Sequence, residues 1–285
     1  MLCVTAQYDL LLPQGSTAAG QALQFRWEST TTLRGCERLV SINHLYDWIS
    51  FLSPSGATIT RSYTGPPGVV DVPMSEVSVH QRIIDPGIIA IVRGIDSAVA
   101  PDIVRAIAAG GVNAIEITAN TPGAVDMIRE VSNSVEDVAI GAGTVLDPET
   151  ARAVQLAGAE FVVTPTVNTD VIETCNRYDT PIATGVMTPT EALTATEAGA
   201  DFCKLFPASA VGPKQISAIN GPLPQVPLIP TGGVSTDNAA AFFEAGAVAL
   251  GVGSSIVDGE AIAAGDFSTL TDAASEFVAI AEEYR

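Results

Sequence analysis

The sequence predicts an α/β protein, a (β/α)8 TIM barrel with an extra N-terminal segment. Eight short apolar runs follow one another between Gly87 and Ser255, and segments with a helical pattern separate them. Eight βα units within roughly 200 residues fit this fold. The alternative is a doubly wound open sheet, which needs a glycine fingerprint after its first strand, and none follows "GIIAIVRG".

The predicted helices begin at residues that favour a helix start and end at glycine. Both signals occur in "DPETARAVQLAGA" from Asp147 and in "TPTEALTATEAGA" from Thr188. We interpret the recurring "AGA" and "AGG" as helix-to-strand turns, not as ancestral repeats. In chain order, the predicted strands are "GIIAIVRG" from Gly87, "AIEITAN" from Ala114, "VAIGAGTV" from Val138, "FVVTPTV" from Phe161, "PIATGVM" from Pro181, "FCKLFPA" from Phe202, "PLIPTGGV" from Pro227 and "AVALGVGSS" from Ala247.

The chain changes character near Met74, which divides it into residues 1–73 and residues 74–285. The first part holds four of the 13 basic residues, five of the 32 acidic residues and both tryptophans, and it lacks a sustained helical or strand period. It is an N-terminal extension that forms a small accessory domain, a disordered arm, or a stretch read from a start codon placed too early. We favour the last interpretation, with "MSEVSVHQRI" as the start of the barrel domain.

Charge and cysteine usage narrow the classes of function. The 285 residues carry 32 acidic and 13 basic side chains, which argues against binding of nucleic acid or an anionic membrane surface. No apolar run approaches the ~20 residues of a membrane span, and the opening "MLCVTAQYDLLLP" is a poor signal peptide. Four scattered cysteines favour reduced thiols and a cytoplasmic location. The acidic, lysine-poor surface suggests a halophilic origin.

The stretch "ADFCKLFPASAVGP" places Lys204, one of only two lysines, on a predicted strand. Side chains alternate along a strand, so Lys204 is predicted to face the barrel interior with Phe202 and Phe206. An ammonium among aromatic rings loses hydration, which leaves some amine free to attack a carbonyl. The alternative is a buried ion pair with Glu116 or Asp201. The scarcity of lysine favours the nucleophile, because the chain uses arginine elsewhere and only a primary amine forms a Schiff base.

Polar side chains occupy one face of the second predicted strand. Glu116 shares this face with Thr118 and Asn120, which is predicted to point towards the barrel mouth. A carboxylate there can transfer protons, or it is only the counter-ion of Lys204 or Arg93. Arg93 and Asn120, which end the first two strands, are candidates for holding a substrate carboxylate or phosphate, with a structural hydrogen-bonding role as the alternative.

Glycine-rich turns end the last two predicted strands. "PTGGV" contains Gly232 and Gly233, and "GVGSS" contains Gly253 and Ser254. In many barrels of this fold, the loops after strands seven and eight bind phosphate through backbone N–H groups and a helix N-terminus. Each motif alone also fits an ordinary turn. The pair at these two strands predicts a phosphate site.

With these residues placed, the sequence resembles the KDPG/KHG aldolase family, class I aldolases acting on 2-keto-3-deoxy-6-phosphogluconate or 4-hydroxy-2-oxoglutarate. The resemblance runs from about Pro86 to the C-terminus and rests on "IEIT", "GAGTV", "VTP", "KLFPAS", "PTGGV" and "GVGSS". It implies that Lys204 forms a Schiff base with the ketone of a small-molecule sugar-acid phosphate while Glu116 moves protons. It also implies a homotrimer without metal or other cofactor, a pyruvate pocket lined by Thr144, Pro165 and Phe206, and a phosphate site at Gly232, Gly233 and Ser254.

Two positions give opposite indications of the substrate. Many family members have arginine where this chain has Asn120, and Arg93 with such an asparagine resembles the 6-phosphogalactonate branch. Thr231 resembles the phosphogluconate-cleaving relatives, because the phosphogalactonate branch tends to have valine there. We expect cleavage of the phosphogluconate derivative to pyruvate and glyceraldehyde 3-phosphate, with phosphogalactonate or 4-hydroxy-2-oxoglutarate cleavage as alternatives. Alternatives of other classes are a phosphate-binding barrel isomerase or epimerase and a non-catalytic sugar-phosphate binding protein.

Overall fold

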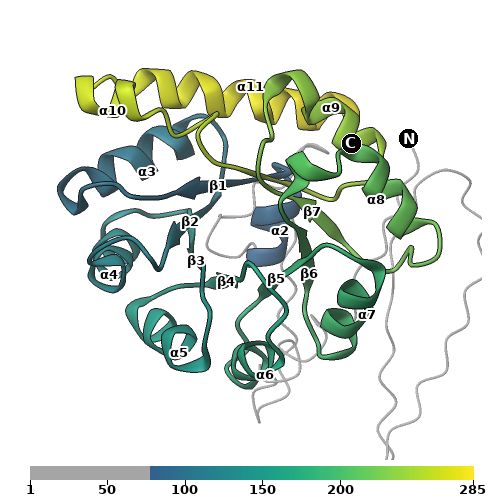
Figure 1. The fold of residues 1–285 in the computed structure, drawn as a ribbon. Coiled ribbons are helices and arrows are strands. Elements are labelled where there is room, and N and C mark those ends of the chain that lie inside the picture. Colours follow the sequence, from purple (N-terminus) through teal and green to yellow (C-terminus); the bar gives the residue numbers. More distant parts are fainter. Residues whose placement is uncertain (1–77) are drawn as a thin grey trace, which may run out of the picture. The chain divides into compact units, whose positions relative to one another are not determined.

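A computed structural model describes residues 78–285 and confirms the predicted (β/α)8 barrel (Figure 1). The predicted extension, residues 1–73, and the boundary at Met74 lie outside the described residues. All eight predicted strands are present within their apolar runs, and the eighth begins at Leu250, later than its run. The strands are β1 (Ile88–Val92), β2 (Ala114–Thr118), β3 (Ala139–Gly143), β4 (Phe161–Val163), β5 (Ile182–Val186), β6 (Phe202–Leu205), β7 (Leu228–Pro230) and β8 (Leu250–Val252).

The strands form one parallel sheet of eight that closes on itself. Its order runs from β7 through β6, β5, β4, β3, β2 and β1 to β8, so that β1 pairs with both β2 and β8. A parallel bridge between Thr231 and Gly251 joins β7 to β8. In such a barrel all carboxyl ends of the strands lie at the same end, and the residues that end the strands therefore gather there.

Helices alternate with the strands and surround the sheet (Figure 1). None of the helices in residues 78–285 is long and apolar enough to cross a membrane. The α-helices are α2 (Val79–Ile84), α3 (Ala100–Ala109), α4 (Ala124–Ser134), α5 (Pro148–Ala157), α6 (Thr169–Arg177), α7 (Pro189–Glu197), α8 (Pro213–Asn220), α9 (Thr236–Glu244), α10 (Gly259–Ala264) and α11 (Ser268–Tyr284), and the short 3-10 turns are η3 (Ser97–Val99) and η4 (Ala208–Ala210).

The predicted helix starts and stops are confirmed at α5 and α7. The side chain of Asp147 accepts a hydrogen bond from the backbone N–H of Thr150, and that of Thr188 accepts one from Glu191. Helix α5 ends at Gly158, whose φ of 108° lies in the left-handed region that glycine enters without strain. Local sequence therefore decides where these helices begin and end.

Two apolar clusters lie on opposite faces of the sheet. The larger cluster, between sheet and helices, includes Ile117, Cys203 and Leu205. The smaller one fills the barrel interior and includes Phe161 and Phe202. This division confirms the predicted alternation along β6. Burying each large apolar side chain contributes about 1.5–3 kcal/mol, and the two clusters together hold the barrel and its helices in place.

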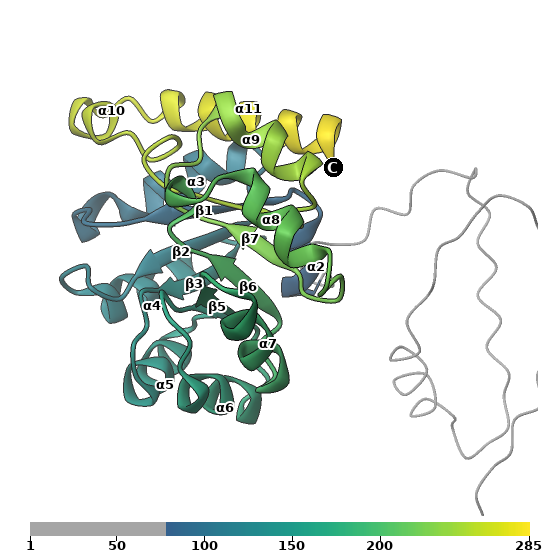
Figure 2. The same cartoon turned by 45° about the vertical axis from the view of Figure 1, so that its right-hand side comes forward.

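Helix α2 covers the amino end of the barrel (Figure 2). Its Ile83 is 1% exposed and belongs to the cluster inside the barrel. His80 Nε2 lies 2.8 Å from Asp201 Oδ1, and Arg82 pairs with Glu160 at 3.5 Å. Both carboxylates directly precede strands, β6 and β4, so α2 closes the end opposite the one where the predicted site residues gather.

Candidate active site

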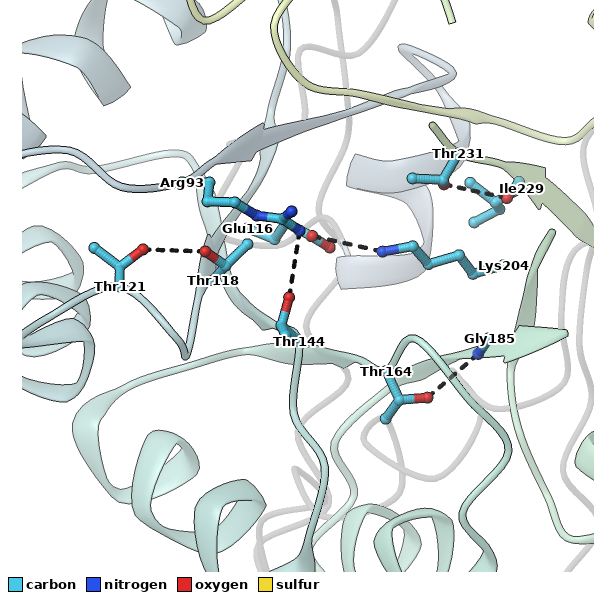
Figure 3. A network of polar contacts seen from close by, with 10 residues as sticks. All are labelled: Arg93, Glu116, Thr118, Thr121, Thr144, Thr164, Gly185, Lys204, Ile229 and Thr231. Carbon is cyan, nitrogen blue, oxygen red and sulfur yellow. Dashed lines mark hydrogen bonds and ion pairs between the residues drawn. The ribbon is translucent and has the colours of Figure 1, made fainter. Parts of the chain in front are cut away.

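Lys204 lies inside the barrel on β6 (Figure 3). The residue is 5% exposed, and its Nζ lies 3.8 Å from Oε1 of Glu116. The same nitrogen lies 5.4 Å from the centre of the Phe206 ring, within the range of a cation–π contact. The structure therefore confirms the inward direction predicted for the lysine and surrounds it with one carboxylate and one aromatic ring.

Glu116 lies on β2 and is 1% exposed. Its distance from Lys204 is that of an ion pair and is too long for a hydrogen bond. Within the described residues, the buried Oε1 has no hydrogen-bond partner. Burial raises the pKa of Glu116, and the positive charges of Lys204 and Arg93 oppose this effect. A carboxyl group with a raised pKa and an unengaged oxygen is suited to accept and return protons.

Arg93 directly follows β1 and reaches across the barrel mouth (Figure 3). Its Nη2 donates to Oγ1 of Thr144 at 3.4 Å. Thr144 has a φ of 57°, a conformation uncommon for a β-branched residue and often associated with functional sites. A guanidinium beside a hydroxyl forms a donor pair suited to an anionic oxygen.

A cavity of about 450 Å³ extends from Lys204 to the loops after β7 and β8. Gly232 and Gly233 have φ values of 91° and 77°, in the left-handed region that glycine enters without strain, so the turn after β7 favours glycine at both positions. The lining comprises Ile91, Arg93, Lys204, Phe206, Thr231, Gly232, Gly233, Val234, Ser235, Gly253, Ser254, Ser255 and Val257.

Hydrogen bonds connect the loop after β6 to the loop after β7. The N–H of Ala208 donates to the carbonyl of Thr231 at 2.8 Å, and the N–H of Ser209 donates to that of Gly232 at 2.9 Å. The hydroxyl of Ser255 donates to the carbonyl of Val234 at 2.8 Å, which ties the loop after β8 to the same group. The lysine strand and the two glycine-rich turns therefore form one connected frame.

The structure brings most of the predicted site residues together. Glu116 contacts Lys204 and Thr144 contacts Arg93, and both Lys204 and Arg93 line the cavity. Pro165 packs against Gly185, the sheet partner of Lys204. Asn120 is exposed and does not line the cavity. The predicted site residues that line the cavity directly are Arg93, Lys204, Phe206, Thr231, Gly232, Gly233, Gly253 and Ser254.

Two further residues, Thr121 and Gly143, belong to the site and were not predicted from the sequence. Oγ1 of Thr121 accepts from the N–H of Gly94 and lies 3.0 Å from Oγ1 of Thr118, so it connects the chain after Arg93 with the end of β2. Gly143 lies under the carboxylate of Glu116. Thr121 could have been found from its position just after the polar face of the second strand. Nothing in the sequence indicated that Gly143 lies beside Glu116.

Metal-binding side chains are not clustered in the described part of the chain. Among residues 78–285, no three His, Cys, Asp or Glu side chains lie close enough together to hold a metal ion. The thiols of Cys175 and Cys203 are buried, and burial raises their pKa to about 12 and about 11 respectively. Neither thiol is therefore an activated nucleophile near neutral pH.

A parallel (β/α)8 barrel with a buried lysine beside a carboxylate at its carboxyl end has the architecture of a class I aldolase. Comparison with known proteins agrees, because residues 79–273 match the KDPG and KHG aldolase family. The chain belongs to this family and is a class I aldolase, a carbon–carbon lyase. This membership favours the aldolase over the isomerase, epimerase and binding-protein alternatives.

Three relatives illustrate the similarity. A 2-dehydro-3-deoxy-6-phosphogalactonate aldolase of Escherichia coli (strain K12) is 39% identical over 171 residues, 59% of this chain and 83% of that protein. A 2-dehydro-3-deoxy-phosphogluconate aldolase of Treponema pallidum (strain Nichols) is 39% identical over 168 residues, 59% of this chain and 80% of that protein. The structure of a KDPG aldolase from Legionella pneumophila, with pyruvate captured as a covalent carbinolamine, has a TM-score of 0.63 at 30% identity, covering 68% of this chain and 95% of that chain.

Proposed function

We propose that this aldolase cleaves 2-keto-3-deoxy-6-phosphogluconate to pyruvate and glyceraldehyde 3-phosphate, with Lys204 as the nucleophile. One observation carries the proposal: Nζ of the buried Lys204 lies 3.8 Å from Glu116 in a site whose cavity extends to two glycine-rich turns. A substrate in this cavity places its ketone at the lysine and its phosphate at the turns.

The chemistry requires one amine and one carboxylate. The lone pair of Lys204 Nζ adds to the C2 carbonyl, and loss of water gives an iminium. The C3–C4 bond then breaks, its electron pair moves towards the iminium, and the C4 hydroxyl gives its proton to Glu116 as the aldehyde leaves. The enamine left on Lys204 takes up a proton at C3, and water hydrolyses the resulting iminium to release pyruvate and the free amine.

Two groups of donors correspond to the two anionic ends of the substrate. The backbone N–H groups of Gly232 and Gly233, with Ser254, would hold the phosphate away from the reacting carbons. Arg93 and Thr144, which contact one another, would hold the carboxylate beside the ketone. Arg93 lines the cavity and Asn120 does not, so Arg93 is the better candidate for this end.

Thr231 favours the phosphogluconate derivative over its C4 epimer. It is 4% exposed, lines the cavity, and its hydroxyl donates to the carbonyl of Ile229 at 3.3 Å (Figure 3). A threonine hydroxyl can rotate from this carbonyl to donate a hydrogen bond to the C4 oxygen in one configuration, which leaves the C4 proton for Glu116. Valine has a similar shape and offers no such donor.

The phosphogalactonate derivative is the second candidate. It is favoured by the presence of both Arg93 and Asn120 in the sequence, the combination that resembles that branch of the family, and Arg93 lines the cavity. We give Thr231 more weight, because Arg93 would bind the carboxylate end that both substrates share, whereas the epimers differ at C4.

The test is pyruvate release from both epimers, measured side by side for the wild type, Thr231→Val and Thr231→Ser. We expect the wild type to prefer the phosphogluconate derivative in kcat/KM, Thr231→Val to erode this preference, and Thr231→Ser to keep most of it. A lost hydrogen bond to a substrate hydroxyl changes discrimination by about 0.5–1.5 kcal/mol, or several-fold. Equal or reversed preference in the wild type would refute the proposal and favour the second candidate.

A further inference from the structure

Gly143 ends β3 and lies directly beneath the carboxylate of Glu116. A Cβ atom at this position would lie 2.7 Å from Cδ of Glu116 and 3.2 Å from its Oε2, and it would be closer still to Oε1. Non-bonded carbon atoms pack at about 3.5–4.0 Å. The carboxylate therefore occupies the volume that any side chain at position 143 would need.

The backbone does not explain the glycine. Gly143 does not have a positive φ. It belongs to the regular strand β3, where it is the sheet partner of Thr118. Alanine adopts such a strand conformation without strain. The requirement at this position therefore comes from the neighbouring carboxylate.

Gly141, on the same strand and the same face, has a different neighbour. A Cβ there would lie 2.6 Å from Cδ2 of Phe161, inside the apolar cluster of the barrel. Gly141 thus makes room for an apolar ring at the middle of the barrel, while Gly143 makes room for the charged group nearer its carboxyl end. The two positions separate a packing effect from an effect on Glu116.

We propose that Gly143 is a positioning residue for the aldolase reaction, because the missing side chain provides the space that holds the Glu116 carboxylate 3.8 Å from Lys204 Nζ. Oε1 of Glu116 has no hydrogen-bond partner among the described residues, so packing and the attraction of Lys204 fix this carboxylate. A methyl group at position 143 would push it out of line with the substrate. The inference rests on the proposed role of Glu116 in proton transfer.

The kinetic test is Gly143→Ala. We expect kcat for aldol cleavage to fall roughly 10²–10⁴-fold, the range for losing a general acid–base group. Pyruvate should still form an adduct with Lys204 that borohydride traps, because the nucleophile is intact. Gly259→Ala is the matched control, since a Cβ at that surface position has no neighbour within 4 Å, and its kcat should equal that of the wild type. An unchanged kcat in Gly143→Ala would overturn the proposal.

A stability cycle tests the spatial claim independently of the reaction. Gly143→Ala should lower the thermal midpoint of the wild type and have little effect in a Glu116→Ala background, where the clashing carboxylate is gone. An equal loss in both backgrounds, or failure of both variants to fold, would contradict the proposal. If the cycle shows coupling but Glu116→Gln retains full activity, the space is confirmed as that of Glu116 and the proposed catalytic role fails instead.

Discussion

The two ends of the barrel hold charged groups in different ways. At the amino end, His80 and Asp201 lie 2.8 Å apart with 44% and 26% of their side chains exposed, and the second oxygen of Asp201 accepts from the N–H of Ile182. At the carboxyl end, Lys204 and Glu116 are more than nine-tenths buried, lie 3.8 Å apart, and leave Oε1 of Glu116 without a hydrogen bond within the described chain.

This difference separates stability from reactivity. A hydrogen-bonded, partly exposed pair retains hydration and costs little to form. A buried pair at ion-pair distance loses its hydration, and the attraction between its charges offsets only part of that free-energy cost. Its members therefore react more readily with an entering ligand. We therefore expect changes at the carboxyl end to affect turnover strongly, and changes at the amino end to affect stability alone.

The largest effect is expected for Lys204→Arg. Arginine retains the positive charge beside Glu116 but cannot form an iminium at neutral pH, so turnover should be abolished. The measurement is pyruvate release from the phosphogluconate derivative. Lys214→Arg is the matched control, because Lys214 is exposed at the start of α8 and should be replaced without loss. Activity of Lys204→Arg within tenfold of the wild type would contradict the role of the lysine.

The next effect concerns the other member of the buried pair. Glu116→Gln keeps the size of the side chain and removes its ability to take up a proton, so kcat should fall roughly 10²–10⁴-fold. The adduct of pyruvate with Lys204 should still form to some extent. Single-turnover cleavage measured beside adduct trapping separates the two steps. Unchanged cleavage would reduce Glu116 to a counter-ion.

The smallest effect is expected at the amino end, where the hydrogen bond to Asp201 raises the pKa of His80 above its usual 6.5. His80 therefore stabilises the fold fully below pH 6.5, and this stabilisation is lost as the pH rises through the raised pKa. Asp201 has a pKa below its usual 3.8, although burial opposes the shift, because His80 and the N–H of Ile182 bind its charged form. Its contribution is lost as the pH falls through that lowered pKa.

The pair should thus stabilise the protein most between pH 3.8 and pH 6.5. Thermal midpoints of the wild type and His80→Gln, measured across this range and above it, should differ most within it. Exposed pairs typically contribute ~0.2–1 kcal/mol, so the difference is small. The kcat of His80→Gln should match the wild type, and a fall comparable to that of Glu116→Gln would break the contrast between the two ends.

The sequence predicted the strands and the inward direction of Lys204, because alternation along a buried strand depends only on local order. Alternation also placed Asn120 on the face of Glu116, yet the structure exposes it. Strand β2 ends at Thr118, and beyond that residue the period of two no longer applies.

Contacts between side chains on different strands could not be predicted from the sequence. The 3.8 Å separation of Lys204 from Glu116, and the closeness of Gly143 to that carboxylate, depend on the stagger of strands around the barrel. No single run of residues contains this stagger. Helix α2 was also not predicted, because it is a single short helix that precedes the first apolar run and packs only through the assembled barrel.

If Lys204 is the Schiff-base nucleophile, borohydride reduction in the presence of pyruvate, followed by mass mapping of the peptides, will locate the adduct on it. The chain has only two lysines, Lys204 and Lys214, so the assignment is unambiguous. We predict a reduced pyruvate adduct on the peptide that carries Lys204, in the wild type and in Lys214→Arg, and none in Lys204→Arg. An adduct on Lys214 alone, or an active enzyme that forms no adduct, would show that Lys204 is not the nucleophile.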